Sequence, residues 1–131
     1  HIMIVHSADG LDEISIATET FVAEFKNGVV TEYTIAPEAF LGERQSLDGL
    51  DVEDAKQSLA MIIDALGKQA GPNSSKAADI IALNAGAALY VAGCAADMHE
   101  GVAMAQDAIG SGLARAKITD LATFTQVQQD G

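Results

Sequence analysis

The fold class is decided by residues 3–16, which read MIVHSADGLDEISI. The apolar run Met3–Val5 is too short for a helix, and it predicts a buried strand. The polar string at 6–13 therefore follows the carboxyl end of a strand. Ligands bind at that edge in open α/β sheets. This stretch predicts an α/β protein with a candidate site directly after its first strand.

A β-hairpin is predicted by the Asn-Gly pair at 27–28, which lies between β-type runs at 21–26 and 29–35. Asn-Gly suits the type I′ turn, whose two central residues both need a positive φ. A two-residue loop pairs Lys26 with Val29. Neither face of the hairpin is cleanly apolar, so we expect a ribbon at the margin of a sheet.

Acidic residues mark the starts of two predicted helices. Asp51 is expected to cap the first, because an Asp side chain accepts backbone N–H bonds at a helix start. Asp97 and Glu100 have the spacing of a capping box for a later helix. Five apolar residues after Asp51 recur at helical spacing and predict one buried face: Val52, Ala55, Leu59, Ile62 and Leu66.

Three further helices are predicted over about 76–95, 98–117 and 120–128. The segment 76–95 is apolar nearly all round, so it should lie inside the assembly. Glycines at 110 and 112 are expected to weaken or bend the second of these helices. Its inward-facing residues are expected to be Val102, Ala105, Ile109 and Leu113.

These elements give few strands for an α/β chain. One short strand of parallel type cannot form a sheet alone. We therefore predict an incomplete part of a mostly parallel sheet, with an antiparallel hairpin and about four helices. Residues 1–131 are expected to be a single carboxyl-terminal part of a larger α/β domain. His1 and Ile2 are interpreted as a remnant of cloning ahead of a start methionine.

The composition limits the classes of partner. The 131 residues are 49% hydrophobic, which argues against a disordered chain. Their net charge of -12 argues against nucleic acid and anionic membranes as partners. The apolar stretch at 80–96 is too short for a membrane span. The single cysteine, Cys94, excludes an intrachain disulfide and is expected to be a small buried residue. We expect a cytoplasmic protein in a reducing compartment.

Asp12 and Glu13 are the strongest candidates for chemistry. Two adjacent carboxylates in a turn can converge on one cavity. Such hard oxygen ligands suit Mg²⁺, which commonly takes one or two carboxylates together with waters and substrate phosphates. A solvated acidic loop is the alternative interpretation. The position of the pair at a strand end, with Gly10 beside it, favours the magnesium site.

The other polar candidates are given structural roles. His6 is expected to bond the loop that follows it, although it could polarise a ligand group. Ser7 and Asp9 are expected to form a turn. Asn84, on the apolar helix, is expected to satisfy neighbouring backbone, with substrate contact as the alternative. The sequence offers no nucleophile with a matching base, no glycine-rich phosphate loop and no Lys/Arg cluster.

Four stretches together resemble one enzyme family in the same order along the chain. They are the acidic motif at 5–15, the hairpin end at 32–38, the helix LNAGAALYVAG at 83–93 and the ending at 101–124. This set resembles anthranilate phosphoribosyltransferase, which joins anthranilate to phosphoribosyl pyrophosphate in tryptophan biosynthesis. The resemblance covers almost the whole chain and corresponds to about the last third of such an enzyme.

The resemblance implies a small helical domain and a large α/β domain, of which this chain is the carboxyl-terminal part. It implies that Asp12 and Glu13 hold Mg²⁺, which bridges to the pyrophosphate of phosphoribosyl pyrophosphate. It leaves the residues that bind anthranilate unassigned. No covalent intermediate is needed, which agrees with the missing nucleophile. We expect the isolated chain to be inactive and to self-associate, as a homo-oligomer.

Two other classes of function stay open at this point. The chain could be a noncatalytic interaction domain that docks through its Ala/Gly-rich helix and binds no divalent metal. It could also belong to a relative of the same fold, such as a pyrimidine nucleoside phosphorylase. The acidic motif ahead of the hairpin favours the anthranilate enzyme over these two.

Overall fold

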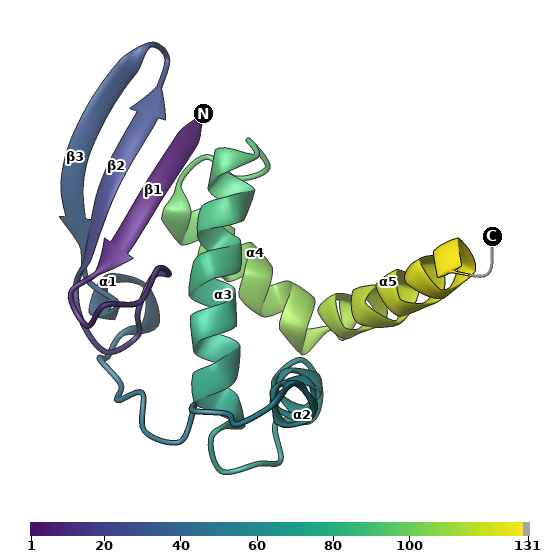
Figure 1. Cartoon of the computed structure of the whole chain (residues 1–131). Coiled ribbons are helices and arrows are strands. Elements are labelled where there is room, and N and C mark those ends of the chain that lie inside the picture. Colours follow the sequence, from purple (N-terminus) through teal and green to yellow (C-terminus); the bar gives the residue numbers. More distant parts are fainter. Residues whose placement is uncertain (130–131) are drawn as a thin grey trace.

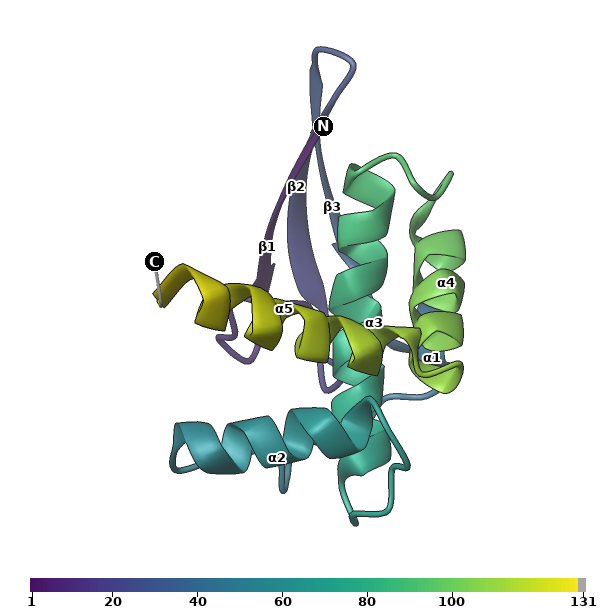
Figure 2. The same cartoon turned by 90° about the vertical axis from the view of Figure 1, so that its right-hand side faces the viewer.

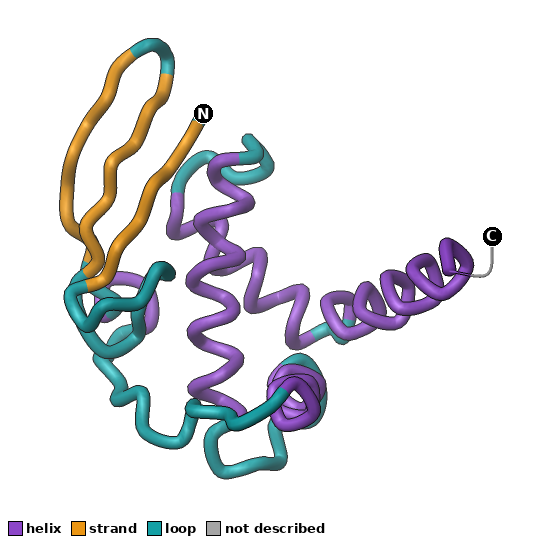
Figure 3. Tube along the Cα trace, in the orientation of Figure 1, coloured by secondary structure: helices purple, strands orange, loops and turns teal. Residues whose placement is uncertain are grey.

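The structure, a computed structural model, describes residues 1–129 and forms a mixed α/β fold (Figures 1 and 3). A three-stranded sheet lies beside a central helix, with the remaining helices around that helix. The predicted α/β class is confirmed. The elements are β1 (Ile2–Ser7), β2 (Thr20–Lys26), β3 (Val29–Ile35), α1 (Glu38–Leu41), α2 (Ala55–Ala65), α3 (Ser74–Val91), α4 (Met98–Gly110) and α5 (Leu113–Gln129).

The hairpin of β2 and β3 forms as predicted. Asn27 and Gly28 have φ values of 52° and 81°, which are the positive angles that the turn requires. Lys26 pairs with Val29, so the predicted register is confirmed. The two-residue turn sets this register because it leaves no spare residue between the strands.

β1 differs from its prediction. It pairs antiparallel with β2, and every strand pair within residues 1–129 is antiparallel. Its burial alternates along the strand: Ile2 and Ile4 are 53% and 68% exposed, while Met3 and Val5 join the core. The expectation of a fully buried strand of parallel type is wrong for this chain. Within the described residues helices cover one face of the sheet, so only alternate side chains are buried.

The helix α3 covers the inner face of the sheet and holds the core together (Figures 1 and 2). Its burial confirms the prediction that this apolar helix lies inside. One core cluster lies between α3, the start of α4 and the segment after β1: Ile14, Ile16, Leu83, Ala87, Met98 and Val102. A second lies between α2, α3 and α4: Ala65, Leu66, Ala77, Ala78, Ala82, Ala105 and Ile109.

α3 and α4 approach each other closely where two glycines meet. A Cβ atom placed on Gly101 would lie 2.3 Å from the carbonyl oxygen of Gly86. A Cβ on Gly86 would lie 2.6 Å from the backbone nitrogen of Val102. Real Cβ atoms do not approach backbone this closely, so the two helix axes keep their separation only while both positions are glycine.

The first long helix begins later than expected. α2 is capped by Asp54, whose side chain accepts the Gln57 N–H at 2.8 Å, and Asp51 lies outside the helix. The predicted cap is therefore wrong by three residues. Of the predicted buried face, Leu66 is buried, whereas Val52 and Leu59 are 41% and 50% exposed.

The last two helices are divided at a different place from the prediction. The capping box at Asp97 is confirmed: Asp97 accepts the Glu100 N–H at 2.9 Å, and Glu100 in turn accepts the Ala96 N–H at 2.6 Å. Gly112, with a φ of 79°, ends this helix, so the expected spans 98–117 and 120–128 become α4 and α5. Val102, Ala105 and Ile109 are buried as predicted, but Leu113 is 65% exposed.

α5 projects away from the rest of the fold (Figures 1 and 2). The Arg115 guanidinium, near the start of α5, donates to the carbonyl of Ile63 in α2 at 2.7 Å and so connects the start of α5 to α2. None of the helices in residues 1–129 is long and apolar enough to cross a membrane.

The glycine contact predicts opposite effects for one substitution at two sites in α4. Gly101→Ala should lower the free energy of unfolding by about 1–3 kcal/mol, because its methyl group would overlap Gly86. Gly110→Ala should be neutral or raise it by up to about 1 kcal/mol, because open space surrounds that position and Ala favours helix. Urea unfolding followed by circular dichroism measures both. Equal effects at the two glycines would contradict the close helix contact.

Candidate functional site

Asp12 and Glu13 lie in the turn after β1, on the wall of a cavity of about 360 Å³. Both residues are exposed. Among residues 1–129 neither carboxylate is paired with a cationic side chain. Asp12 and Glu13, at the strand-end turn, thus line the cavity without an ion-pair partner in the described part of the chain. The other walls come from the segment before α2, from α2 and from α3: Leu47, Leu50, Asp51, Val52, Ser58, Met61, Ile62, Ala77, Ile80 and Ile81, with Leu11 beside the acids.

The lining of this cavity is mostly apolar, with acidic residues at one edge. Its lining contains no Lys or Arg, and its third carboxylate is that of Asp51. Within the described residues no three His, Cys, Asp or Glu side chains are placed to hold a metal ion. Asp12 and Glu13 alone still fit Mg²⁺, because this ion usually keeps several waters and takes further oxygens from substrate phosphates. As a donor set, two carboxylates would leave positions on such an ion for other oxygen ligands.

The turn itself is held by a small hydrogen-bond network, as predicted for Ser7 and Asp9. The Ser7 hydroxyl donates to the Asp9 carboxylate, and the Ser15 hydroxyl donates to the other Asp9 oxygen at 2.6 Å. The backbone N–H of Ser7 also donates to the carbonyl of Leu11 at 3.0 Å. Burial by itself would raise the pKa of Asp9, but the bonds from Ser15 and Ser7 outweigh it and lower that pKa.

Asn84 reaches the segment directly after the acidic pair. Its carboxamide oxygen accepts the Ile14 N–H at 2.9 Å, and its nitrogen donates to the Ile14 carbonyl at 2.9 Å. The same nitrogen donates to the Ile80 carbonyl, one helical turn earlier in α3, also at 2.9 Å. The predicted role of Asn84, satisfying neighbouring backbone, is therefore confirmed.

Two other polar candidates lie away from this network. His6 is exposed on β1 and borders a shallow hollow on the outer face of the sheet. Ser7 and Asp9, not His6, bond the loop that follows. Cys94 is exposed, so the expectation that it is buried is wrong. α3 ends at Val91, and Gly93 turns the chain with a φ of 74°, which carries Cys94 out of the helical core.

The segment that forms the cavity wall opposite the acids is anchored to α3. The Gln45 side chain donates to Asp79 at 2.8 Å, and the Lys76 ammonium donates to the Asp48 carbonyl at 3.0 Å. A third bond runs from the Asn73 amide to the Gly49 carbonyl at 3.1 Å. One helix therefore positions both walls of the cavity, through Asn84 on the acidic side and these anchors on the other.

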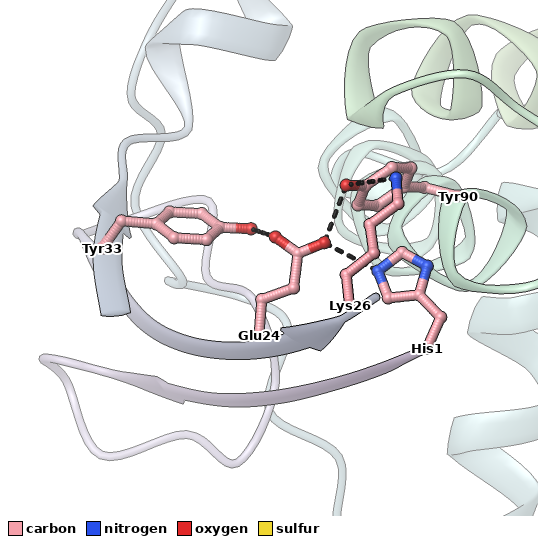
Figure 4. Close-up of polar contacts among 5 residues, drawn as sticks. All are labelled: His1, Glu24, Lys26, Tyr33 and Tyr90. Atoms are coloured by element: carbon pink, nitrogen blue, oxygen red, sulfur yellow. Dashed lines mark hydrogen bonds and ion pairs between the residues drawn. The ribbon is translucent and has the colours of Figure 1, made fainter. Parts of the chain in front are cut away.

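A second polar cluster joins the sheet to the carboxyl-terminal part of α3 (Figure 4). Glu24 accepts hydrogen bonds from the hydroxyls of Tyr33 and Tyr90 at 2.8 and 2.7 Å. His1 lies 2.7 Å from the same carboxylate, and the Lys26 ammonium lies 4.5 Å above the Tyr90 ring. Burial, then the hydrogen bond to Glu24 and its charge, raise the pKa of Tyr33 far above its usual range. We call these five residues (His1, Glu24, Lys26, Tyr33 and Tyr90) the Glu24 latch, because their contacts join β2 and β3 to α3.

This latch was not predicted from the sequence, where His1 was set aside as a remnant of cloning. Part of it could have been found. The hairpin register places Glu24 opposite Thr31, so Tyr33 is its diagonal neighbour on the same face. Tyr90 lies 66 residues further along the chain, and no local pattern indicates that contact.

The class of this protein is shown by its sequence. The chain belongs to the glycosyl transferase family, a/b domain, whose family model matches residues 1–115. Among curated relatives, the anthranilate phosphoribosyltransferase of Cellvibrio japonicus is 59% identical over 129 residues. That match covers 98% of this chain and 38% of the relative. The chain thus spans well under half the length of the relative it matches.

Solved structures share the fold. The crystal structure of anthranilate phosphoribosyltransferase from Thermus thermophilus matches with a TM-score of 0.79 and 29% identity, covering 95% of this chain and 35% of that one. The Saccharomyces cerevisiae enzyme in complex with PRPP and Mg matches with a TM-score of 0.68 and 20% identity, over 84% of this chain and 31% of that one. At that identity the second likeness shows the fold alone.

The lowered pKa of Asp9 predicts an acid-dependent loss of stability. A carboxylate with a depressed folded-state pKa stabilises the fold above its ordinary value of about 3.9, and loses this effect as the pH falls through the lowered pKa. Asp9→Asn should therefore destabilise the chain at pH 7, and the deficit should shrink as the pH falls below the ordinary carboxyl value and through the lowered pKa. Unfolding free energies at several pH values test this.

Asp107→Asn is the matched control, because Asp107 is an exposed carboxylate in no ion pair of the described chain. A deficit for Asp9→Asn that stays constant from pH 7 to the acid end would show that the carboxylate form of Asp9 is not what holds the turn.

Proposed function

We propose that this chain forms the metal-facing part of an anthranilate phosphoribosyltransferase. In this proposal the enzyme transfers the phosphoribosyl group of phosphoribosyl pyrophosphate to the amine of anthranilate, in the cytoplasm. Asp12 and Glu13 hold Mg²⁺ beside the pyrophosphate. The observation that carries the proposal is the pair of unpaired carboxylates at the cavity wall, in a chain 59% identical to a relative of that name.

The geometry supports a site shared with a phosphorylated substrate. Two adjacent carboxylates in a turn offer hard oxygen ligands and leave positions on the ion for phosphate oxygens. The same cavity contains no cationic side chain in its lining. A pyrophosphate at this edge would meet Asp12, Glu13 and Asp51, and their charges would repel it. A bound divalent ion reverses that local sign.

Each protein group has a limited task in the reaction. Asp12 and Glu13 hold the ion at the leaving-group end of the substrate, and the Asn84 and Asp9 contacts keep their turn in place. When bound, Mg²⁺ neutralises charge that develops on the departing pyrophosphate. The anthranilate amine attacks the ribose carbon directly, so this chain needs no nucleophile. We assign no residue here to the anthranilate site.

The proposal is tested by removing both ligands. In the full-length enzyme that contains these residues, Asp12→Asn with Glu13→Gln should lower kcat/KM at least about 100-fold, because several kcal/mol of transition-state charge stabilisation is lost. The measurement is anthranilate consumption with phosphoribosyl pyrophosphate across a Mg²⁺ titration. The 131-residue chain alone should give no turnover, because it contains the proposed metal ligands but no glycine-rich phosphate loop to bind the substrate.

The control is Glu43→Gln with Asp107→Asn, which makes the same change in charge at two exposed positions away from the cavity. It should leave the rate and the Mg²⁺ requirement unchanged. If the Asp12/Glu13 variant kept its rate and its dependence on magnesium, the proposed role of the acidic pair would have to be abandoned.

We further propose that the chain self-associates through the outer face of its sheet. Ile4, Phe21 and Phe25 are 68%, 53% and 42% exposed on that face. Contiguous apolar surface of this kind favours association in water. Ile4→Lys should therefore shift the chain toward monomer in sedimentation velocity experiments. Thr31→Lys, with the same charge change on the inner face of β3, should not. A wild-type chain that is monomeric at high concentration would contradict this.

A further inference from the structure

We infer that Asn84 is a positioning residue for the acidic pair: its carboxamide fixes the backbone at Ile14 and thereby sets how Asp12 and Glu13 face the cavity. This inference rests on the proposed metal site. It gives Asn84 a task beyond satisfying neighbouring backbone, because the backbone it binds is that of the residue directly after Glu13.

The contact is a two-point clamp. The N–H and the carbonyl of Ile14 both bond to the one carboxamide of Asn84, at 2.9 Å each. This pair of bonds imitates the pairing of two antiparallel strand residues that exchange both hydrogen bonds. One bond would let the Ile14 backbone rotate about it, whereas two bonds fix the orientation of the peptide planes on both sides. The third bond, to Ile80, fixes the carboxamide itself on α3.

The hydrogen bonds of the clamp are part-buried, beside a buried residue. The Ile14 side chain is 2% exposed and packs with Leu83 and Ala87 of α3 in one core cluster. Hydrogen bonds shielded from water are stronger, and unpaired partners there cost more. Loss of Asn84 therefore leaves the N–H and the carbonyl of Ile14, which are only partly open to water, without their protein partner.

The orientation of Asp12 and Glu13 depends on the chain segments directly before and after them. Ahead of the pair, the Ser7 hydroxyl bonds Asp9, and the same carboxylate also accepts from Ser15, which follows Ile14 in the chain. On the other side, Asn84 holds Ile14. Asp12 and Glu13 lie between these two anchors, without an ion-pair partner in the described chain. Their direction toward the cavity is therefore set by the backbone, and Asn84 controls the anchor that is next to Glu13.

The chemistry of the clamp is specific to asparagine. A carboxamide is both donor and acceptor, and Ile14 requires both. Aspartate would place a carboxylate against the carbonyls of Ile14 and Ile80. Glutamine keeps the carboxamide but moves it outward by one methylene, so the Ile14 backbone would have to shift to meet it. We therefore expect Asn84→Gln to form a folded protein with a displaced turn, and Asn84→Ala to lose the clamp entirely.

We expect both Asn84 variants to bind a divalent metal ion more weakly than their loss of folding stability alone would explain. The probe is Mn²⁺ with inorganic pyrophosphate, added to the full-length enzyme, with free Mn²⁺ counted by its electron paramagnetic resonance signal. Asn84→Ala and Asn84→Gln should raise the dissociation constant at least about tenfold. Ile109→Ala, a cavity-forming change in the other core cluster, destabilises the fold and is the matched control. It should leave the dissociation constant unchanged.

The outcomes separate the two proposals. If Asp12→Asn with Glu13→Gln leaves Mn²⁺ binding intact, the proposed metal site fails. If that variant loses Mn²⁺ but both Asn84 variants bind it as Ile109→Ala does, the site stands and the positioning role of Asn84 is overturned. Hydrogen exchange at the Ile14 amide gives a second readout: it should be faster in Asn84→Ala than in Ile109→Ala at equal thermal stability. Equal exchange would also overturn the inference.

Discussion

The close contact of α3 and α4 at Gly86 and Gly101 is the constraint on which the rest of the structure depends. With no side chain at either position, the backbones of the two helices touch, and this contact sets the position and rotation of α3. Asn84 lies two residues before Gly86 and Tyr90 one turn after it, so the same contact aims Asn84 at Ile14 and Tyr90 at Glu24.

The parts of the fold that were predicted from sequence are those whose signals are local. The Asn-Gly turn determines its own backbone angles, and the Asp97 capping box closes within four residues. The predicted helix start at Asp51 was wrong because Asp51 and Asp54 are both aspartates that directly precede an apolar residue of the predicted helix face. Only the bond to Gln57 selects Asp54. The burial of β1 was wrong because it depends on what covers the sheet, which a three-residue apolar run does not indicate.

In the candidate site, too, the local features were predicted and the contacts between distant segments were not. Asp12 and Glu13 line a cavity after β1, although the described strands are antiparallel and the rule for parallel sheets does not apply to them; their binding of metal stays a prediction. Asn84 was recognised as an amide that must be bonded, but its partner is 70 residues away along the chain. The Glu24 latch was missed for the same reason. Contacts between distant segments arise from packing, and no sequence spacing reports them.

The net charge of the chain limits which ions can bind at the acidic turn. At a net charge of -12, a buried or half-buried anion binds to this protein only where positive charge has been placed for it. The cavity beside Asp12 and Glu13 contains no basic side chain in its lining. Lys76 is near in sequence to the cavity wall but directs its donors to Ser46 and Asp48. In the proposed function the turn would therefore bind a cation first, and a phosphate ester only through that cation.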